Sequence, residues 1–163
     1  MGCSNSTADK PKLTVEQKRL IIDSWKELHI DLERIGMLMF MGMFGTHPQT
    51  REFFNFRGTS DDPKNTQRLR EHGLRFMSLV KKILVFIDEK PRLDAMLLDL
   101  GRRHQEYKAD FNLIDVFGEQ FILSVRPTLK HSWNPDVESA WAQLFKYISY
   151  MMKKGMMQTD KNK

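Results

Sequence analysis

The sequence predicts an all-α protein of one domain, and three observations lead to this prediction. Apolar residues recur at helical spacing in several long segments, and capping or helix-stopping residues separate these segments. In addition, no segment shows the sustained alternation of apolar and polar residues that is typical of strands. At 163 residues the chain is long enough to bury one sizeable core and short for two.

The first two helices follow from a capping pattern and a proline. Residues 1–12 are small and polar, and we expect a flexible tail there. Thr14 and Gln17 make a capping-box pattern ahead of apolar residues at helical spacing, so a helix should begin at Thr14. A second helix, rich in Met and Phe, is predicted over about 32–46, and Pro48 should end it.

Turn residues and prolines divide the rest of the chain into four more helices. The stretch "GTSDDPKN" at 58–65 predicts a turn, followed by a long helix to about residue 88. Pro91 suits the first turn of a helix that runs to about 106, and another helix is predicted over about 114–130. Asn134 as cap and Pro135 as first residue open a last helix to about 154. We expect the domain to span 13–156, with a polar tail at 157–163.

The composition excludes several classes of protein. The net charge of +5 comes from 26 basic and 21 acidic residues spread along the chain, without a basic stripe or motif for nucleic acid. The single cysteine excludes an internal disulfide. No run of apolar residues is long enough for a membrane span, so we expect the protein to stay in the cytosol. The 11 methionines are predicted to fill the core rather than bind metal.

The first residues, "MGCSNST", match the pattern for N-myristoylation of Gly2. A myristoyl chain alone binds membranes weakly, whereas a palmitoyl group on the adjacent Cys3 would make the attachment stable. We therefore expect the acyl chains to attach the protein to the cytoplasmic face of a cellular membrane, and we expect this to be the plasma membrane. The alternative is an unstructured polar start on a cytoplasmic protein. Four nearby cations could assist at an anionic leaflet: Lys10, Lys12, Lys18 and Arg19.

Two histidines lie on the apolar faces of predicted helices. His72 falls on the stripe of the helix after the turn, and His104 continues the row of Leu93, Leu97 and Leu100 in the next helix. The connection between these helices is short, so they should be antiparallel neighbours with both imidazoles facing a shared space. Taken singly, each histidine is more readily explained as a residue of the core than as a metal ligand.

Together, the two histidines suit a flat, apolar cofactor that carries iron. Imidazole is a natural axial ligand of haem iron, and the gap should be lined by Phe and Leu. Zinc is disfavoured, because no Cys or carboxylate shares the stripes and the other histidines are scattered.

The sequence resembles the globins over about residues 13–154. "THPQTREFFNF" looks like the globin segment that delivers a Phe, here Phe54, to the haem face. "LREHGLRF" looks like the distal helix with His72, and "LLDLGRRHQ" looks like the proximal helix with Leu100 one turn before His104. The resemblance implies a globin fold of six to eight helices that enclose one haem b.

Within the family, "LGRRHQ" and "NPDVESAWAQLF" look more like neuroglobin, cytoglobin and the acylated globin X group than like muscle or blood globins. The chain also departs from the usual pattern. The small helix that globins carry after Phe56 should be reduced or missing, and Phe56 stands where neuroglobin has a Tyr. Phe40 and Phe76 match positions that more often hold Leu and Val, so the distal pocket should be crowded.

The resemblance implies a role for each site residue. His104 would be the proximal iron ligand, while His72 would either stabilise bound oxygen or take the sixth coordination position itself; the neuroglobin-like pattern favours the second role. Arg75, Arg103 and Lys108 are candidates to bind the haem propionates, although each is equally well an ordinary solvated cation.

Three functions stay open at this stage. The first is a membrane-tethered, bis-His haem protein for electron transfer, reactive-oxygen or nitric-oxide chemistry, or sensing, with an external electron donor or acceptor. The second is a conventional oxygen carrier or store, and the third is a haem-free, lipidated interaction module. Whether the protein is an enzyme is left open, because no dedicated acid–base pair or nucleophile stands out.

Overall fold

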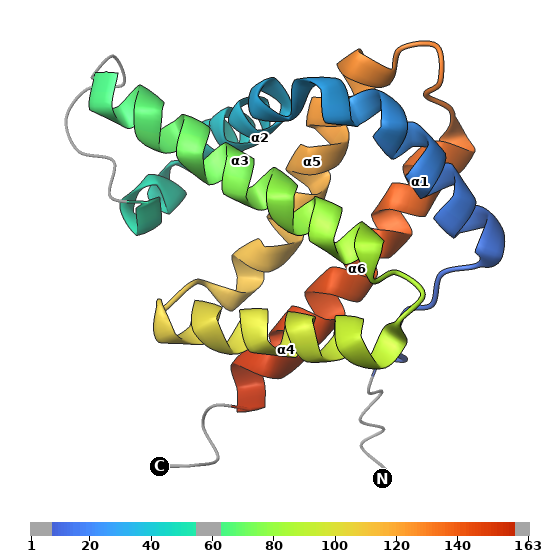
Figure 1. Cartoon of the computed structure of the whole chain (residues 1–163). Helices are drawn as coiled ribbons and strands as arrows, with labels where there is room; N and C mark the ends of the chain where they lie inside the picture. The colour runs from blue at the N-terminus through green and yellow to red at the C-terminus, as the bar shows by residue number, and fades with distance from the viewer. Residues whose placement is uncertain (1–7, 55–62, 159–163) are drawn as a thin grey trace, which may run out of the picture.

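The computed structural model describes residues 8–54 and 63–158, and all structural statements below refer to these ranges. Within them the chain forms helices and no strands (Figure 1). The six α-helices are α1 (Val15–Leu28), α2 (Leu32–Thr46), α3 (Pro63–Val85), α4 (Lys90–Glu106), α5 (Ile114–Leu129) and α6 (Pro135–Gln158). Three short 3₁₀ helices join them: η1 (His29–Asp31), η2 (Pro48–Phe54) and η3 (Phe111–Leu113).

The predicted helix starts are confirmed by side-chain caps. The Thr14 side chain accepts a hydrogen bond from the Gln17 backbone, and the Gln17 side chain accepts one from the Thr14 backbone, which is a complete capping box. Asn134 Oδ1 accepts from the backbone N–H groups of Asp136 and Val137, each at 3.0 Å. α2 ends at Thr46, two residues before Pro48.

Two helix ends differ from the prediction. α3 stops at Val85 instead of continuing to about residue 88, because the chain turns there to bring Phe86 and Ile87 onto the core. α6 continues past residue 154 to Gln158, since Met156 is buried and extends its apolar face. The prediction that the small globin helix after Phe56 is reduced or missing concerns residues that, like Phe56 itself, lie outside the described ranges.

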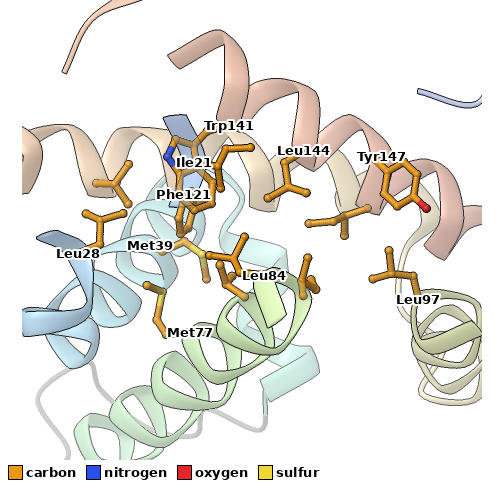
Figure 2. Close-up of a cluster of buried hydrophobic side chains, with 14 of the residues drawn as sticks. Ile21, Leu28, Met39, Met77, Leu84, Leu97, Phe121, Trp141, Leu144 and Tyr147 are labelled. Carbon is orange, nitrogen blue, oxygen red and sulfur yellow. The ribbon is translucent and has the colours of Figure 1, made fainter. Parts of the chain in front are cut away.

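The core lies where the six α-helices meet, with Leu97 contributed by α4 (Figure 2). Trp141 of α6 is fully buried, stacks at an angle on Phe121 with ring centroids 4.8 Å apart, and donates a hydrogen bond to Ser24 of α1 at 2.9 Å. The prediction that methionines fill the core holds for most of them, including Met39 and Met43. Two are exceptions on the surface: Met41 and Met157 are 55% and 58% exposed.

The crossing of α2 and α3 places two glycines back to back. A Cβ atom on Gly36 would lie 2.6 Å from the backbone of Gly73, which real structures do not tolerate. The two helices can therefore approach closely only because both positions lack a side chain. Gly73 follows His72, so this contact also fixes where that histidine sits.

None of the helices described is long and apolar enough to cross a membrane.

Candidate functional site

His104 lies near the end of α4 and is oriented by its own helix. Its Nδ1 is 2.8 Å from the carbonyl oxygen of Leu100. A carbonyl can only accept, so Nδ1 carries the proton and donates it. In the neutral ring the lone pair is then on the other nitrogen, Nε2, so Nε2 is the atom that can bind a metal ion.

His72 lies on α3 and is half-buried among aromatic rings. Its ring centroid is 5.1 Å from that of Phe54 and 6.2 Å from that of Phe40. Burial lowers the pKa of His72, and the positive charges of Arg75 and Arg68 lower it further against the opposing effect of Glu71. The imidazole is therefore neutral at pH 7, the form in which it can act as a metal ligand.

Both histidines line one cavity of about 260 Å³. An adjoining cavity of about 70 Å³ extends behind His104, toward α3 and α6. The two cavities share His104, Ile114 and Phe117. The structure thus brings the two imidazoles predicted from the sequence to one cavity, His72 from α3 and His104 from α4. The two helices make little direct contact, so they are not the packed neighbours that the short connection predicts.

The phenylalanines and the leucine predicted for the site gather at the same place. Phe54 lines the larger cavity, whereas Phe76 and Leu100 line the smaller one. Phe40 is buried and contacts Phe54 edge-on at 5.1 Å and Phe76 at 6.4 Å. The pocket is crowded with aromatic rings, as the sequence predicts.

The three predicted propionate partners line neither cavity. Arg75 is 3.7 Å from Glu71, and Arg103 pairs with Asp99, each within its own helix at the surface. Lys108 lies just after α4, in a left-handed backbone conformation with φ of 56°. Their role toward a cofactor stays a prediction. The lipidation residues Gly2 and Cys3 lie outside the described residues.

The sequence reasoning missed several residues that line the larger cavity, notably Phe117, Met43, Thr50 and Tyr107. Phe117 could have been found, because it lies four residues before the buried Phe121 on the apolar side of α5. Thr50 could not, since η2 shows no periodic pattern. Tyr107 lines the cavity although its side chain is 73% exposed, so it marks the cavity mouth.

The residues present fit an iron-bearing, planar, apolar cofactor. The walls are mainly aromatic and aliphatic, and two imidazoles reach the same space from α3 and α4. Across the described ranges, no group of three or more His, Cys, Asp or Glu side chains is arranged to hold a metal ion by itself. Two imidazoles from separate helices are a donor set that suits the axial positions of a haem iron.

Comparison with known proteins agrees with this geometry. The sequence model of the Globin family matches residues 38–152. Neuroglobin from Chaenocephalus aceratus is 24% identical over 155 residues, which cover 93% of this chain and 98% of that protein. An anaerobic nitrite reductase from Brassica napus is 24% identical over 154 residues, with 92% of this chain and 96% of that protein covered.

Among solved structures, a hexacoordinated heme protein from an anhydrobiotic tardigrade has the same fold. The TM-score is 0.81 at 20% sequence identity, and the match covers 89% of this chain and 96% of that one. Because the Globin match spans well over half of the sequence, this chain belongs to the globin family, and its cofactor is a haem.

Proposed function

We propose that this globin is hexacoordinate, with His104 and His72 on opposite sides of the haem iron, and that it serves redox or gas-ligand signalling at a membrane. One observation carries the proposal: α3 and α4 bring one imidazole each into the same cavity. The haem supplies an iron that changes between ferric and ferrous states and binds small gases such as oxygen.

The surroundings of His72 support its role as an internal ligand. Phe40 and Phe54 hold its ring within the pocket, and burial keeps it neutral. An external ligand must then displace His72, so its apparent affinity falls in proportion to the fraction of the protein in the open form. The tardigrade protein of the same fold is described as hexacoordinated, which supports the same state here.

A redox role is supported by the kind of relatives that the chain has. They include neuroglobins and a plant anaerobic nitrite reductase. We infer that electrons come from or go to an external partner, because an iron that changes between ferric and ferrous states needs a donor and an acceptor. Nitrite reduction is one chemistry to test.

Attachment to the membrane rests on the sequence of the first residues, Gly2 and Cys3. The four cations that were expected to assist at the lipid surface are for the most part engaged elsewhere. Lys10 pairs with Asp94, Lys18 pairs with Asp88, and Arg19 bridges two acidic residues of its own helix. The proposed tether therefore depends on the acyl chains more than on these charges.

Carbon monoxide binding to the ferrous protein tests the role of His72. In the wild type we expect a rate that levels off at high carbon monoxide concentration, because release of His72 becomes limiting. In His72→Leu the rate should rise linearly and be faster. His131→Leu, at an exposed histidine, is the matched control and should behave as the wild type. Fast, linear binding by the wild type would instead identify a conventional oxygen carrier or store.

A further inference from the structure

α4 carries the proximal histidine, yet it is held to the fold mainly by one helix. Within the described part of the chain, α4 makes its main helix–helix contact with α6, which crosses it in Figure 1. The contact is close: a Cβ atom on Gly101 would collide with the backbone of Met152, and one on Gly155 with the backbone of Leu98. On the side toward α3 lies the cavity that both histidines line. Any additional support for α4 thus acts directly on the position of His104.

Such support comes from a cluster of three polar side chains on three segments. Lys10, from the segment before α1, places its Nζ 2.5 Å from Oδ2 of Asp94 on α4. The hydroxyl of Tyr147 on α6 donates to Oδ1 of the same carboxylate. The Lys10 ammonium also lies 5.3 Å from the centre of the Tyr147 ring, which is a cation–π contact. Asp94 therefore joins α4 to α6 and to the N-terminal segment at once.

The cluster is partly sheltered: the Lys10 and Asp94 side chains are 37% and 24% exposed, whereas Tyr147 is buried beneath them. Tyr147 is only 3% exposed, and Figure 2 shows it across from Leu97 of α4. Burial would raise the pKa of Asp94, but the hydrogen bonds from Lys10 and Tyr147 and the charges of Lys10 and Lys90 lower it on balance. The pKa of Tyr147 is raised by burial and by Asp94, which keeps its hydroxyl protonated as a donor.

The N-terminal segment is fastened at a second point beside the cluster. Gln143 Nε2 on α6 donates to the backbone carbonyl of Lys12 at 2.9 Å, and Leu13 packs on the core. Residues 10–13, which we name the N-terminal strap, thus contact both helices. The strap is held before the first helix begins at Val15.

We propose that Asp94 is a positioning residue, which acts through α4 on the proximal histidine. Asp94 and His104 are ten residues apart on the same helix, about 15 Å along its axis. A helix of this length moves as a rigid body, so fixing its first half against the strap and α6 sets the orientation of the imidazole at its other end. This inference rests on the proposed ligation of iron by His104.

The first test measures how tightly α4 is held. In the full-length, haem-loaded protein, Lys10→Met should accelerate amide hydrogen exchange in α4 by a factor of about two to five, the loss expected for one partly exposed ion pair. Exchange in α5 should stay unchanged. Lys12→Met is the matched control, since its side chain is not part of the cluster, and it should leave α4 unchanged. Lys10→Arg, which keeps the charge, should restore slow exchange. Unchanged α4 exchange in Lys10→Met would overturn the proposal.

The second test measures the bond between the iron and the imidazole of His104. In a His72→Leu background the ferrous iron has a single protein ligand, and resonance Raman spectroscopy reports the iron–histidine stretching band. Lys10→Met and Asp94→Asn should each shift or broaden this band, and combining them should add little, because both act through one cluster. Lys12→Met should leave the band in place.

The two tests separate the failure of this inference from the failure of the proposed function. If α4 exchanges faster but the iron–histidine band does not move, Asp94 only stabilises the fold and the positioning role is wrong. If no iron–histidine band appears even with the strap intact, His104 does not bind the iron, and the proposed function fails together with the inference that depends on it.

Discussion

At the scale of single residues, the site depends on where each imidazole carries its proton and on whether the ring is charged before any cofactor binds. The Leu100 carbonyl fixes the proton of His104 on Nδ1 and so leaves Nε2 free. His72 is kept neutral by burial among phenylalanine rings. The hydrogen bond to His104 and the burial of His72 both come from neighbouring residues in the fold, not from a dedicated metal-binding motif.

Replacing His104 by Gly should remove the proximal ligand and leave a space of imidazole size. We expect His104→Gly to lose haem more readily, and free imidazole to restore retention by filling the space, because the surrounding cavity persists. Transfer of haem to an acceptor protein measures the loss rate. If imidazole has no effect and haem is retained as in the wild type, His104 is not the ligand.

Asp115 on α5 links stability to pH. Burial raises the pKa of Asp115, but hydrogen bonds from Lys153 and Ser149 and the charge of Lys153 lower it on balance. A carboxyl with a lowered pKa stabilises the folded state above its unfolded pKa of about 3.9, and this contribution disappears as the pH falls through the folded value.

We therefore expect the free energy of unfolding to decrease as the pH falls below about 4, and Asp115→Asn to be less stable at neutral pH with a shallower decrease in acid. Urea unfolding at a series of pH values measures both. Asp9→Asn, at an exposed position in the N-terminal segment, is the control. A decrease as steep in Asp115→Asn as in the wild type would contradict this assignment.

At the scale of helices, the bounds of most elements can be predicted because their signals are local. The Thr14–Gln17 capping box and the Asn134 cap each act within one turn, so a few residues are enough to reveal them. The end of α3 at Val85 cannot be predicted in this way, since it depends on the contacts that Phe86 and Ile87 make with distant parts of the core.

The close contact between α2 and α3 gives a test at this scale. Gly36→Ala should destabilise the protein by about 1–3 kcal/mol, because the added methyl group would lie 2.6 Å from the Gly73 backbone and force the helices apart. Gly45→Ala is the matched control, since it lies on the same helix and a Cβ there meets nothing within 4 Å. It should be neutral or stabilising by helix propensity. Urea unfolding midpoints compare the two, and equal midpoints would show that α2 and α3 are not held this closely.

At the scale of the whole molecule, the sequence predicts the two central histidines but not everything around them. Helical spacing places His72 and His104 on apolar faces, and a short connection directs these faces toward one space. The surface pairs of Arg75 and Arg103, and the cluster of Lys10, Asp94 and Tyr147, join side chains whose meeting depends on rotamers or on long-range packing. Such contacts follow no local sequence pattern, so they cannot be predicted from the sequence.

The proposed tether also belongs to this scale. We expect Gly2→Ala to shift the protein from the membrane fraction to the soluble fraction of cells, because myristoylation requires Gly2. Cys3→Ser should give weaker, reversible binding, since one acyl chain remains. Ser4→Ala, which leaves the pattern intact, is the control. Membrane association that persists in Gly2→Ala would argue against acylation.

The absorption spectrum of the purified full-length protein, recorded in the ferric and ferrous states without added ligand, tests the central claim most directly. Two imidazoles on one iron predict a low-spin, six-coordinate spectrum in both states, and in His72→Leu a five-coordinate ferrous form. A five-coordinate, high-spin ferrous spectrum in the wild type would contradict the claim that His72 and His104 share the iron.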